Sequence, residues 1–274
     1  MMILSNPPEL AWIWAGVAVY AAATPLAMAG GAKAPARERL LLGLLGLGLA
    51  LFAFAIGVRW TRIGHGPFIN MFEILASNLF SLGFIYALAY WRLPALRPGA
   101  AVAMPVMLVP ALWLLAVSPA DSHLPPTYDT PWLWVHVATG KIFLGICLVA
   151  LGLAGVMLSR RAGFARRFRA MPADAALDRL AWRFMGVALA FHSLMLISGA
   201  VWAQDAWGRY WAWDPIEAWA FLTWLAMAAA LHLRTTWRVP PWLGAAMILG
   251  IFVLAFLTFF GVPFLSNSPH KGAI

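Results

Sequence analysis

Residues 132–158 read WLWVHVATGKIFLGICLVALGLAGVML and contain a single charged side chain, Lys141. A helix needs about 20 predominantly apolar residues to cross the hydrocarbon core of a bilayer, so this stretch is long enough to span a membrane. Seven further runs of similar composition occupy residues 10–30, 40–58, 71–91, 99–117, 181–202, 216–233 and 241–264. Because lipid offers the backbone no hydrogen-bond partners, all eight runs are predicted to be helices.

The overall composition agrees with a membrane protein. The chain has 274 residues, of which 63% are hydrophobic and 11% are charged, and its mean hydropathy is +0.81. Soluble domains are about half apolar and about a quarter charged, so a soluble enzyme is excluded. We predict an all-α polytopic membrane protein, a bundle of eight transmembrane helices that forms one integral membrane domain over residues 1–274. Residues 1–10 lack the basic region and the cleavage site of a signal peptide, so the first run is expected to be a retained span.

The net charge of +9 is unevenly distributed along the chain. Basic residues gather in alternate connections, at Lys33, Arg37, Arg39, Arg92, Arg97, Arg160, Arg161, Arg166, Arg167, Arg169, Arg179, Arg183, Arg234 and Arg238. We expect a multi-pass protein of the bacterial cytoplasmic membrane. The positive-inside rule assigns the basic connections to the cytoplasm, so both termini are expected on the outer, periplasmic side. The charge is therefore interpreted as an orientation signal, and no nucleic-acid partner is expected.

A tryptophan-rich segment is predicted to form an outer loop at residues 202–217, which read WAQDAWGRYWAWDPIE. Single tryptophans at a membrane interface are accounted for by the usual aromatic belt. Their concentration in one loop instead favours a flat aromatic surface that suits a large planar ligand. The aromatic residues of this candidate binding surface are Trp202, Trp207, Tyr210, Trp211 and Trp213.

The end of this segment carries a helix-start pattern. Asp214 at the N-cap, Pro215 at the first helical position and Glu217 two residues later match a capping box. Such a box would fix the start of the seventh helix and hold the tryptophans in place. Direct contact of Asp214 or Glu217 with a ligand is a second, open possibility.

Two histidines flank the tryptophan-rich segment on the same predicted face. His136 lies near the outer end of the fifth run, and His270 lies just past the outer end of the eighth. This placement suits axial ligation of a haem iron from both sides, with surface imidazoles as the alternative. His65 lies in another outer connection. His232 follows Asp214 by about 27 Å of helix, so it belongs to the inner leaflet and not to the outer site.

Four basic residues stand on the outer side against the general trend: Arg59, Arg62, Arg209 and Lys271. Each lies near a histidine or tryptophan of the candidate site. Arginine binds carboxylates through paired hydrogen bonds, so some of these residues are predicted to hold haem propionates. Contact with lipid headgroups is the alternative for any one of them. Glu73 and Asn78, early in the third run, are expected to support the same pocket.

These motifs resemble the CcsA/ResC family, the haem-handling membrane components, with a WWD domain, of the cytochrome c synthase of the system II maturation pathway. The resemblance rests on SGAVWA (198–203), WGRYWAWDPIEAW (207–219) and LHLR (231–234). It extends to GHGPFINMFE (64–73), WLWVHV (132–137) and the C-terminal His270. It therefore covers essentially the whole chain.

The resemblance implies a function and a set of ligands. His136 and His270 would be the axial ligands of a haem b presented at the outer face, and residues 202–213 would form its platform. The haem would be attached through thioether bonds to the CXXCH motif of apocytochrome c, so the chain would be a haem lyase component. His232 would ligate a second, translocating haem inside the membrane, opposite a ligand from a CcsB/ResB partner subunit. Thiol-reducing proteins of the pathway would be further partners.

Some positions depart from the family pattern, and two other functions stay open. Ile216 replaces a lysine, and His192 in the sixth run stands where a proline is commoner. Lys141 lies about 140° around the helix from His136, so the two are expected not to share a face. A CcmC-like haem exporter that delivers haem to a chaperone is one alternative. A b-type electron-transfer protein with bis-histidine haems is the other, and it would need both inner ligands in this chain.

Overall fold

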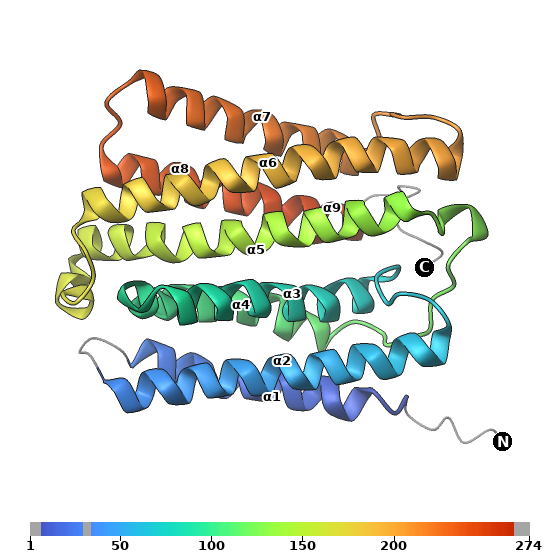
Figure 1. Cartoon of the computed structure of the whole chain (residues 1–274), viewed down its shortest axis with the longest axis horizontal. Coiled ribbons are helices and arrows are strands. Elements are labelled where there is room, and N and C mark those ends of the chain that lie inside the picture. Colours follow the sequence, from blue (N-terminus) through green and yellow to red (C-terminus); the bar gives the residue numbers. More distant parts are fainter. Residues whose placement is uncertain (1–6, 30–33, 266–274) are drawn as a thin grey trace.

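The computed structural model describes residues 7–29 and 34–265, and it is helical at each of the eight predicted runs. The long helices lie side by side as one bundle (Figure 1). They are α1 (Leu10–Met28), α2 (Pro35–Ile63), α3 (Met71–Arg92), α4 (Ala100–Leu114), α5 (Pro131–Ser159), α6 (Asp174–Trp207), α7 (Pro215–Thr236) and α8 (Pro241–Phe256), followed by the short α9 (Val262–Leu265). Within the described residues there is no strand, and eight helices are long and apolar enough to cross a membrane. The prediction of an all-helical multi-pass membrane protein is confirmed.

Several helix boundaries differ from the prediction. Helix α2 continues to Ile63 rather than ending at residue 58, so Arg59 and Arg62 lie on its last turns. A 3₁₀ turn, Pro94–Gly99, precedes α4, because prolines at both of its ends restrict the backbone there. Helix α8 passes through a π turn, Leu257–Gly261, before α9 begins.

Helix α6 extends five residues beyond its predicted end and stops at Trp207. No breaker interrupts the chain before Gly208, which adopts a φ of 74° and so ends the helix in the left-handed conformation that favours glycine. Trp202 and Trp207 therefore belong to a helix. The connection to α7 consists only of residues 208–214, shorter than the loop predicted at 202–217.

Helix α5 occupies the centre of the bundle and packs against α3, α4, α6 and α8. From Phe143 to Met157 almost every side chain is buried. Small residues on this helix let its neighbours approach closely. A Cβ atom on Gly145 would lie 2.4 Å from Cδ1 of Ile85 on α3, so only glycine fits at that contact.

The two ends of the bundle differ in their chemistry. The α3–α4, α5–α6 and α7–α8 connections and the start of α2 lie at one end, at the left of Figure 1. The described arginines assigned to the cytoplasm gather there, at or near the ends of these helices. The α2–α3, α4–α5 and α6–α7 connections lie at the opposite end. That second end carries the tryptophan-rich segment.

A buried ion-pair cluster holds the tryptophan-rich end together, and Arg59 is its centre. The Arg59 side chain is only 2% exposed, and all five of its N–H donors are used. Nε and Nη2 donate to Glu73 at 3.0 and 2.9 Å, and Nη1 donates to Glu9 at 3.1 Å. The two remaining donors bind the carbonyl oxygens of Pro119 and Ala120. Arg59 thereby joins α2, the start of α3, the residue before α1 and the α4–α5 connection.

Arg62 extends this cluster towards solvent. Its guanidinium group binds Glu9 and donates to both carboxylate oxygens of Asp121, at 2.6 and 2.7 Å. The hydrogen bonds from Arg62 hold the pKa of Asp121 below its ordinary value, against the opposing effect of burial. The stabilisation from Asp121 is therefore complete above the ordinary pKa of an aspartate and is lost as the pH falls through the lowered pKa.

Replacing Arg59 is expected to destabilise the bundle strongly. The variant Arg59→Met leaves Glu9 and Glu73 buried without their cation, and breaking such a buried pair costs about 3–5 kcal/mol. Thermal unfolding of the detergent-solubilised protein measures this loss. The control is Arg39→Met, on the same helix but exposed and without an ion pair within the described residues. Equal melting temperatures for the two variants would contradict the assigned role of the cluster.

Candidate functional site

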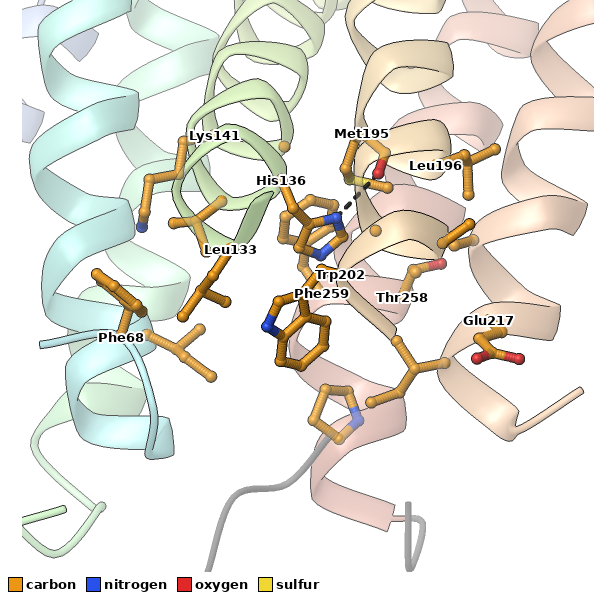
Figure 2. Close-up of a pocket in the computed structure, with 18 of the residues that line it drawn as sticks. Phe68, Leu133, His136, Lys141, Met195, Leu196, Trp202, Glu217, Thr258 and Phe259 are labelled. Carbon is orange, nitrogen blue, oxygen red and sulfur yellow. Dashed lines mark hydrogen bonds between the residues drawn. The ribbon is translucent and has the colours of Figure 1, made fainter. Parts of the chain in front are cut away.

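A cavity of about 210 Å³ lies at the tryptophan-rich end, bordered by α3, α5, α6, α7 and the π turn after α8 (Figure 2). Its walls are mostly apolar, with a few polar side chains among them. Concave, largely apolar sites with a few polar groups are typical of small-molecule binding. Five of the predicted site residues line it: His136, Trp202, Tyr210, Trp211 and Glu217.

His136 projects from the first turns of α5 into this cavity. Its Nδ1 lies 2.9 Å from the backbone carbonyl oxygen of Met195 on α6. A carbonyl oxygen only accepts hydrogen bonds, so Nδ1 carries the proton and, in the neutral ring, Nε2 carries the lone pair. Histidines that bind metals usually have this second hydrogen bond, which fixes the tautomer and the ring orientation.

Gly199 on α6 makes room for the His136 ring. A Cβ atom at position 199 would lie 2.6 Å from Nδ1 and 2.8 Å from Cε1 of His136, so any larger residue would displace the imidazole. On the other side, the ring stacks on Trp202, with centroids 6.2 Å apart and planes 12° apart. Helix α6 thus sets the position of the histidine through a carbonyl, a glycine and a tryptophan.

Tyr128, which the sequence patterns did not mark, links the tryptophans at the end of α6. It ends a 3₁₀ turn, Pro126–Tyr128, in the α4–α5 connection. Trp202 donates from Nε1 to the backbone oxygen of Tyr128 at 3.0 Å, and Trp207 donates to its hydroxyl oxygen at 2.9 Å. A single tyrosine in a connection has no spacing that could have identified it. Only the tertiary structure brings it to the site.

The predicted capping box at the start of α7 is confirmed. Oδ1 of Asp214 accepts hydrogen bonds from the backbone N–H groups of Ile216 and Glu217, at 2.8 and 3.0 Å. The Glu217 carboxylate accepts from the N–H of Ala212 at 2.7 Å and also borders the cavity. It therefore orders the α6–α7 connection as well as the helix start. Trp213, between these residues, has a φ of 59°, a conformation that a bulky side chain rarely adopts.

The tryptophans form two edge-to-face groups rather than one flat surface. Trp202 and Trp207 meet at 68° beside Tyr128, whereas Trp211 and Trp213 meet at 85° and pack on Phe221 of α7. Edge-to-face contacts are the favoured arrangement of aromatic pairs, which explains why the rings do not lie in one plane. Trp207 and Trp213 do not line the cavity. Trp213 is 69% exposed and Tyr210, which lines the cavity, is 60% exposed, so both side chains are accessible.

The predicted basic residues occupy other positions. Arg59 and Arg62 lie in the ion-pair cluster, bound to carboxylates, and they do not border the cavity. Arg209 is exposed in the α6–α7 connection. Nε2 of His65 binds the carbonyl oxygen of Ser122 at 3.0 Å and so joins two outer connections. Their predicted contact with a ligand stays a prediction.

Two other predicted residues, His270 and Lys271, lie outside the residues that the structure describes. Their proposed contact with the site therefore also stays a prediction.

The remaining ionisable residues lie at different depths. His232 is exposed near the arginine-rich end of α7, far along the helix from the cavity. His192 is 1% exposed in α6 and stacks on Phe143, with ring centroids 4.2 Å apart. Lys141 borders the same cavity as His136, although the sequence predicted different faces of the helix. The long side chain of Lys141 extends towards α3 and reaches the cavity on that side (Figure 2).

Comparison with known proteins identifies the family. Residues 40–270 match the family model described as cytochrome C assembly protein. The chain belongs to this family. It is 30% identical over 254 residues to the cytochrome c biogenesis protein CcsA of Chlamydomonas reinhardtii, covering 87% of this chain and 69% of that protein. It is 29% identical to CcsA of a Picosynechococcus strain, covering 84% of this chain and 87% of that relative.

A solved structure shares the fold. The cytochrome c haem lyase CcmF superimposes with a TM-score of 0.72 over 98% of this chain, at 17% sequence identity. The chain spans about half of that protein, 49% of its length, so the likeness concerns the fold alone. Family membership assigns this multi-pass membrane protein to cytochrome c biogenesis. The cavity and the tryptophan-rich segment lie within the matched residues.

The Glu217 carboxylate is expected to order the α6–α7 connection. In Glu217→Ala, the N–H of Ala212 loses its acceptor, so amide hydrogen exchange at residues 211–214 should become faster. The loss of a hydrogen bond to a charged group should lower the free energy of unfolding by about 1.5–3 kcal/mol. Hydrogen-exchange mass spectrometry of the detergent-solubilised protein measures the first effect. The matched control is Asp205→Ala, which removes an exposed carboxylate one helical turn before the connection and should leave exchange at 211–214 unchanged. Slow exchange in both variants would refute the proposed role.

Proposed function

We propose that this protein is the CcsA-type component of a cytochrome c synthase. It would hold haem b in the cavity at the periplasmic face and present it to apocytochrome c for covalent attachment. The observation that carries this proposal is the orientation of His136. Its Nδ1–H donates to the carbonyl oxygen of Met195, so in the neutral ring Nε2 is the basic nitrogen. The ring borders a cavity that is lined by aromatic and aliphatic side chains. A histidine nitrogen is one of the usual axial ligands of haem iron, so an oriented imidazole in an apolar pocket supports this proposal.

The site residues fit haem as the substrate of the reaction. His136 would bind the iron on one face, and His270, by the family resemblance, would bind it on the other. Trp202 and Trp211 would contact the porphyrin, with Tyr210 and Trp213 at the mouth. Asp214 and Glu217 would act by fixing the connection that carries these rings. Trp207 would support Trp202 through Tyr128.

The chemistry supplied by the substrate is the reactivity of its two vinyl groups. Each cysteine thiol of the CXXCH motif adds across one vinyl double bond, forming a carbon–sulfur bond while the hydrogen goes to the other vinyl carbon. This addition needs no oxidant. The chain contributes by orienting the substrate, excluding water from the apolar cavity and leaving one edge accessible, so catalysis is mainly positioning. His136 and His270 are the catalytic residues of this proposal.

A second haem position inside the membrane is part of the same proposal. His232 is exposed near the inner end of α7, where it can meet a ligand from another subunit. A CcsB/ResB-type partner would supply that ligand and take part in haem translocation. An ionisable residue at membrane depth is commonly functional and finds its partner in a neighbouring chain or helix.

The proposed orientation places the tryptophan-rich end in the periplasm of a bacterium. Support comes from the arginines at the opposite end, which the positive-inside rule assigns to the cytoplasm. Apocytochrome c and the thiol-reducing proteins of the pathway would then meet the cavity from the periplasm. The single-domain organisation over residues 1–274 belongs to the same proposal.

Covalent haem attachment is the direct test. We expect co-expression of this chain, a CcsB/ResB partner and an acceptor with a CXXCH motif to yield an acceptor that keeps haem on a denaturing gel. Omitting this chain should abolish the haem stain. A wild-type chain that binds haem but gives no covalent product, and instead transfers haem to a chaperone, would support the exporter alternative and refute the synthase.

The position of the His136 ring should control haem retention. His136→Ala and His270→Ala are expected to weaken haem retention during purification, with partial restoration by exogenous imidazole. Gly199→Ala should also weaken it, by about tenfold or more, because its Cβ displaces the ring while the ligand itself remains. Absorbance spectra of the purified proteins measure the haem content.

The control is Gly186→Ala on the same helix, where a new Cβ would meet no atom within 4 Å. It should retain haem as the wild type does. If Gly199→Ala matched Gly186→Ala in haem content and spectrum, the assignment of His136 as a ligand held by α6 would be wrong.

A further inference from the structure

Lys141 brings a positive charge into the wall of the cavity without a matching negative charge. It lies on α5, within a membrane span, and its ammonium group donates to the hydroxyl oxygen of Ser77 on α3 at 2.8 Å. Among the described residues, no carboxylate lies within 4.0 Å of it. A serine hydroxyl is neutral, so the charge is hydrogen-bonded but not compensated.

An uncompensated ammonium in a low-dielectric cavity is costly, and in membrane proteins such groups are usually paired. The pairing group can come from a ligand as well as from the protein. Among the described residues that line this cavity, Lys141 is the only lysine or arginine. The cavity therefore favours a ligand with a negative charge on the α3 side.

The cations at the outer end contrast with Lys141. All five donors of Arg59 are already used, and Arg62 is bound to Glu9 and Asp121. These arginines would have to abandon carboxylates of the protein to bind an anionic ligand. The Lys141 ammonium has three donors, and its hydrogen bond to the neutral Ser77 hydroxyl uses only one of them.

Asn78 adds a second polar group to the same wall. Its side chain is buried and borders the cavity, and its Nδ2 donates to the backbone oxygen of Ile74 at 2.8 Å. Its Oδ1 is buried and has no hydrogen-bond partner among the described residues. Polar side chains from two neighbouring helices, α5 and α3, therefore belong to the lining of this cavity. An ionised carboxylate only accepts hydrogen bonds, so its partner in this wall would be the Lys141 ammonium and not the Oδ1 of Asn78.

The location of Lys141 relative to His136 defines how a planar ligand would lie. The backbone of Lys141 is five residues further along α5, about 7.5 Å along the helix axis, and its side chain runs back so that the ammonium lies level with the His136 ring (Figure 2). Its side chain extends towards α3, on the opposite side of His136 from Glu217 (Figure 2). A carboxylate bound there would lie at the edge of the ligand nearest α3.

We propose that Lys141 binds one propionate of the haem substrate and thereby sets the rotation of the porphyrin about the axis through His136. This inference rests on the proposed function. In haem b, the two propionates lie on neighbouring pyrrole rings, and the two vinyl groups lie on the other two rings. Anchoring a propionate at the edge nearest α3 turns the vinyl groups away from α3, towards the side of the cavity formed by α6, α7 and their connection.

The test compares two probes that differ only in their carboxylates: iron protoporphyrin IX and its dimethyl ester. Binding to the full chain in detergent is measured by quenching of tryptophan fluorescence. The wild type should prefer the free acid. Lys141→Gln, which keeps a donor for Ser77 but loses the charge, should weaken binding of the free acid by about tenfold or more. It should leave binding of the ester unchanged, so the preference should disappear.

Two further variants separate charge from packing. Lys141→Met removes charge and hydrogen bond together and should behave as Lys141→Gln does. Ser77→Ala removes the hydrogen bond but leaves the ammonium, so it should retain the preference for the free acid. If Lys141 only joined α3 to α5, Ser77→Ala would match Lys141→Met and both probes would weaken equally.

The outcomes also distinguish a failure of the proposed function from a failure of the role assigned to Lys141. A wild type that binds neither probe would overturn the proposed function, and this inference with it. A wild type that binds both probes, with an unchanged preference in Lys141→Gln, would overturn the role of Lys141 alone. Loss of the preference in Arg209→Gln instead would assign the propionate contact to the outer arginine.

Discussion

The constraint on which this structure depends is that a bilayer offers no hydrogen-bond partners. Backbone groups within the spans are therefore satisfied inside helices, and polar side chains at depth need partners from the protein or from a ligand. Arg59 meets this requirement completely, because carboxylates and carbonyl oxygens use all five of its donors. His136 meets it through the carbonyl of Met195. Lys141 has a hydrogen bond but no counter-charge among the described residues. Arg59, which is fully paired, therefore has a structural role, whereas we propose that Lys141 pairs with a substrate.

The tryptophan-rich end contains two capping boxes of the same kind. Asn70 and Glu73 form a capping box at the start of α3, as Asp214 and Glu217 do at the start of α7. In each case the glutamate also serves a neighbour: Glu73 binds Arg59, and Glu217 binds the N–H of Ala212. Helix starts and outer connections are thereby ordered by the same carboxylates. These ordered helix starts and connections position Trp202 beside His136 and Trp211 beside Phe221.

Sequence reasoning located the spans well, because long apolar runs with few charges leave little choice of structure in lipid. It was less accurate at boundaries. Helix α6 continues to Trp207 because nothing before Gly208 interrupts it, and two tryptophans assigned to a loop are helical. The capping box at Asp214 was predictable, since it depends on residues three positions apart. The roles of Arg59 and Tyr128 were not, because their partners lie far away in the chain.

The sequence by itself determined the membrane location, the number of spans, the alternation of basic and aromatic connections, and the family. These properties follow from local composition and from motifs that are contiguous in the chain. Only the tertiary structure decided which residues face one cavity. It joined Gly199 to His136, used Arg59 for the ion-pair cluster, and brought Lys141 to the side of the cavity nearest α3. Such contacts depend on how the helices pack against one another and on how each is rotated about its axis. The sequence gives only the angle between two residues on the same helix, and this angle does not predict which residues of neighbouring helices they contact.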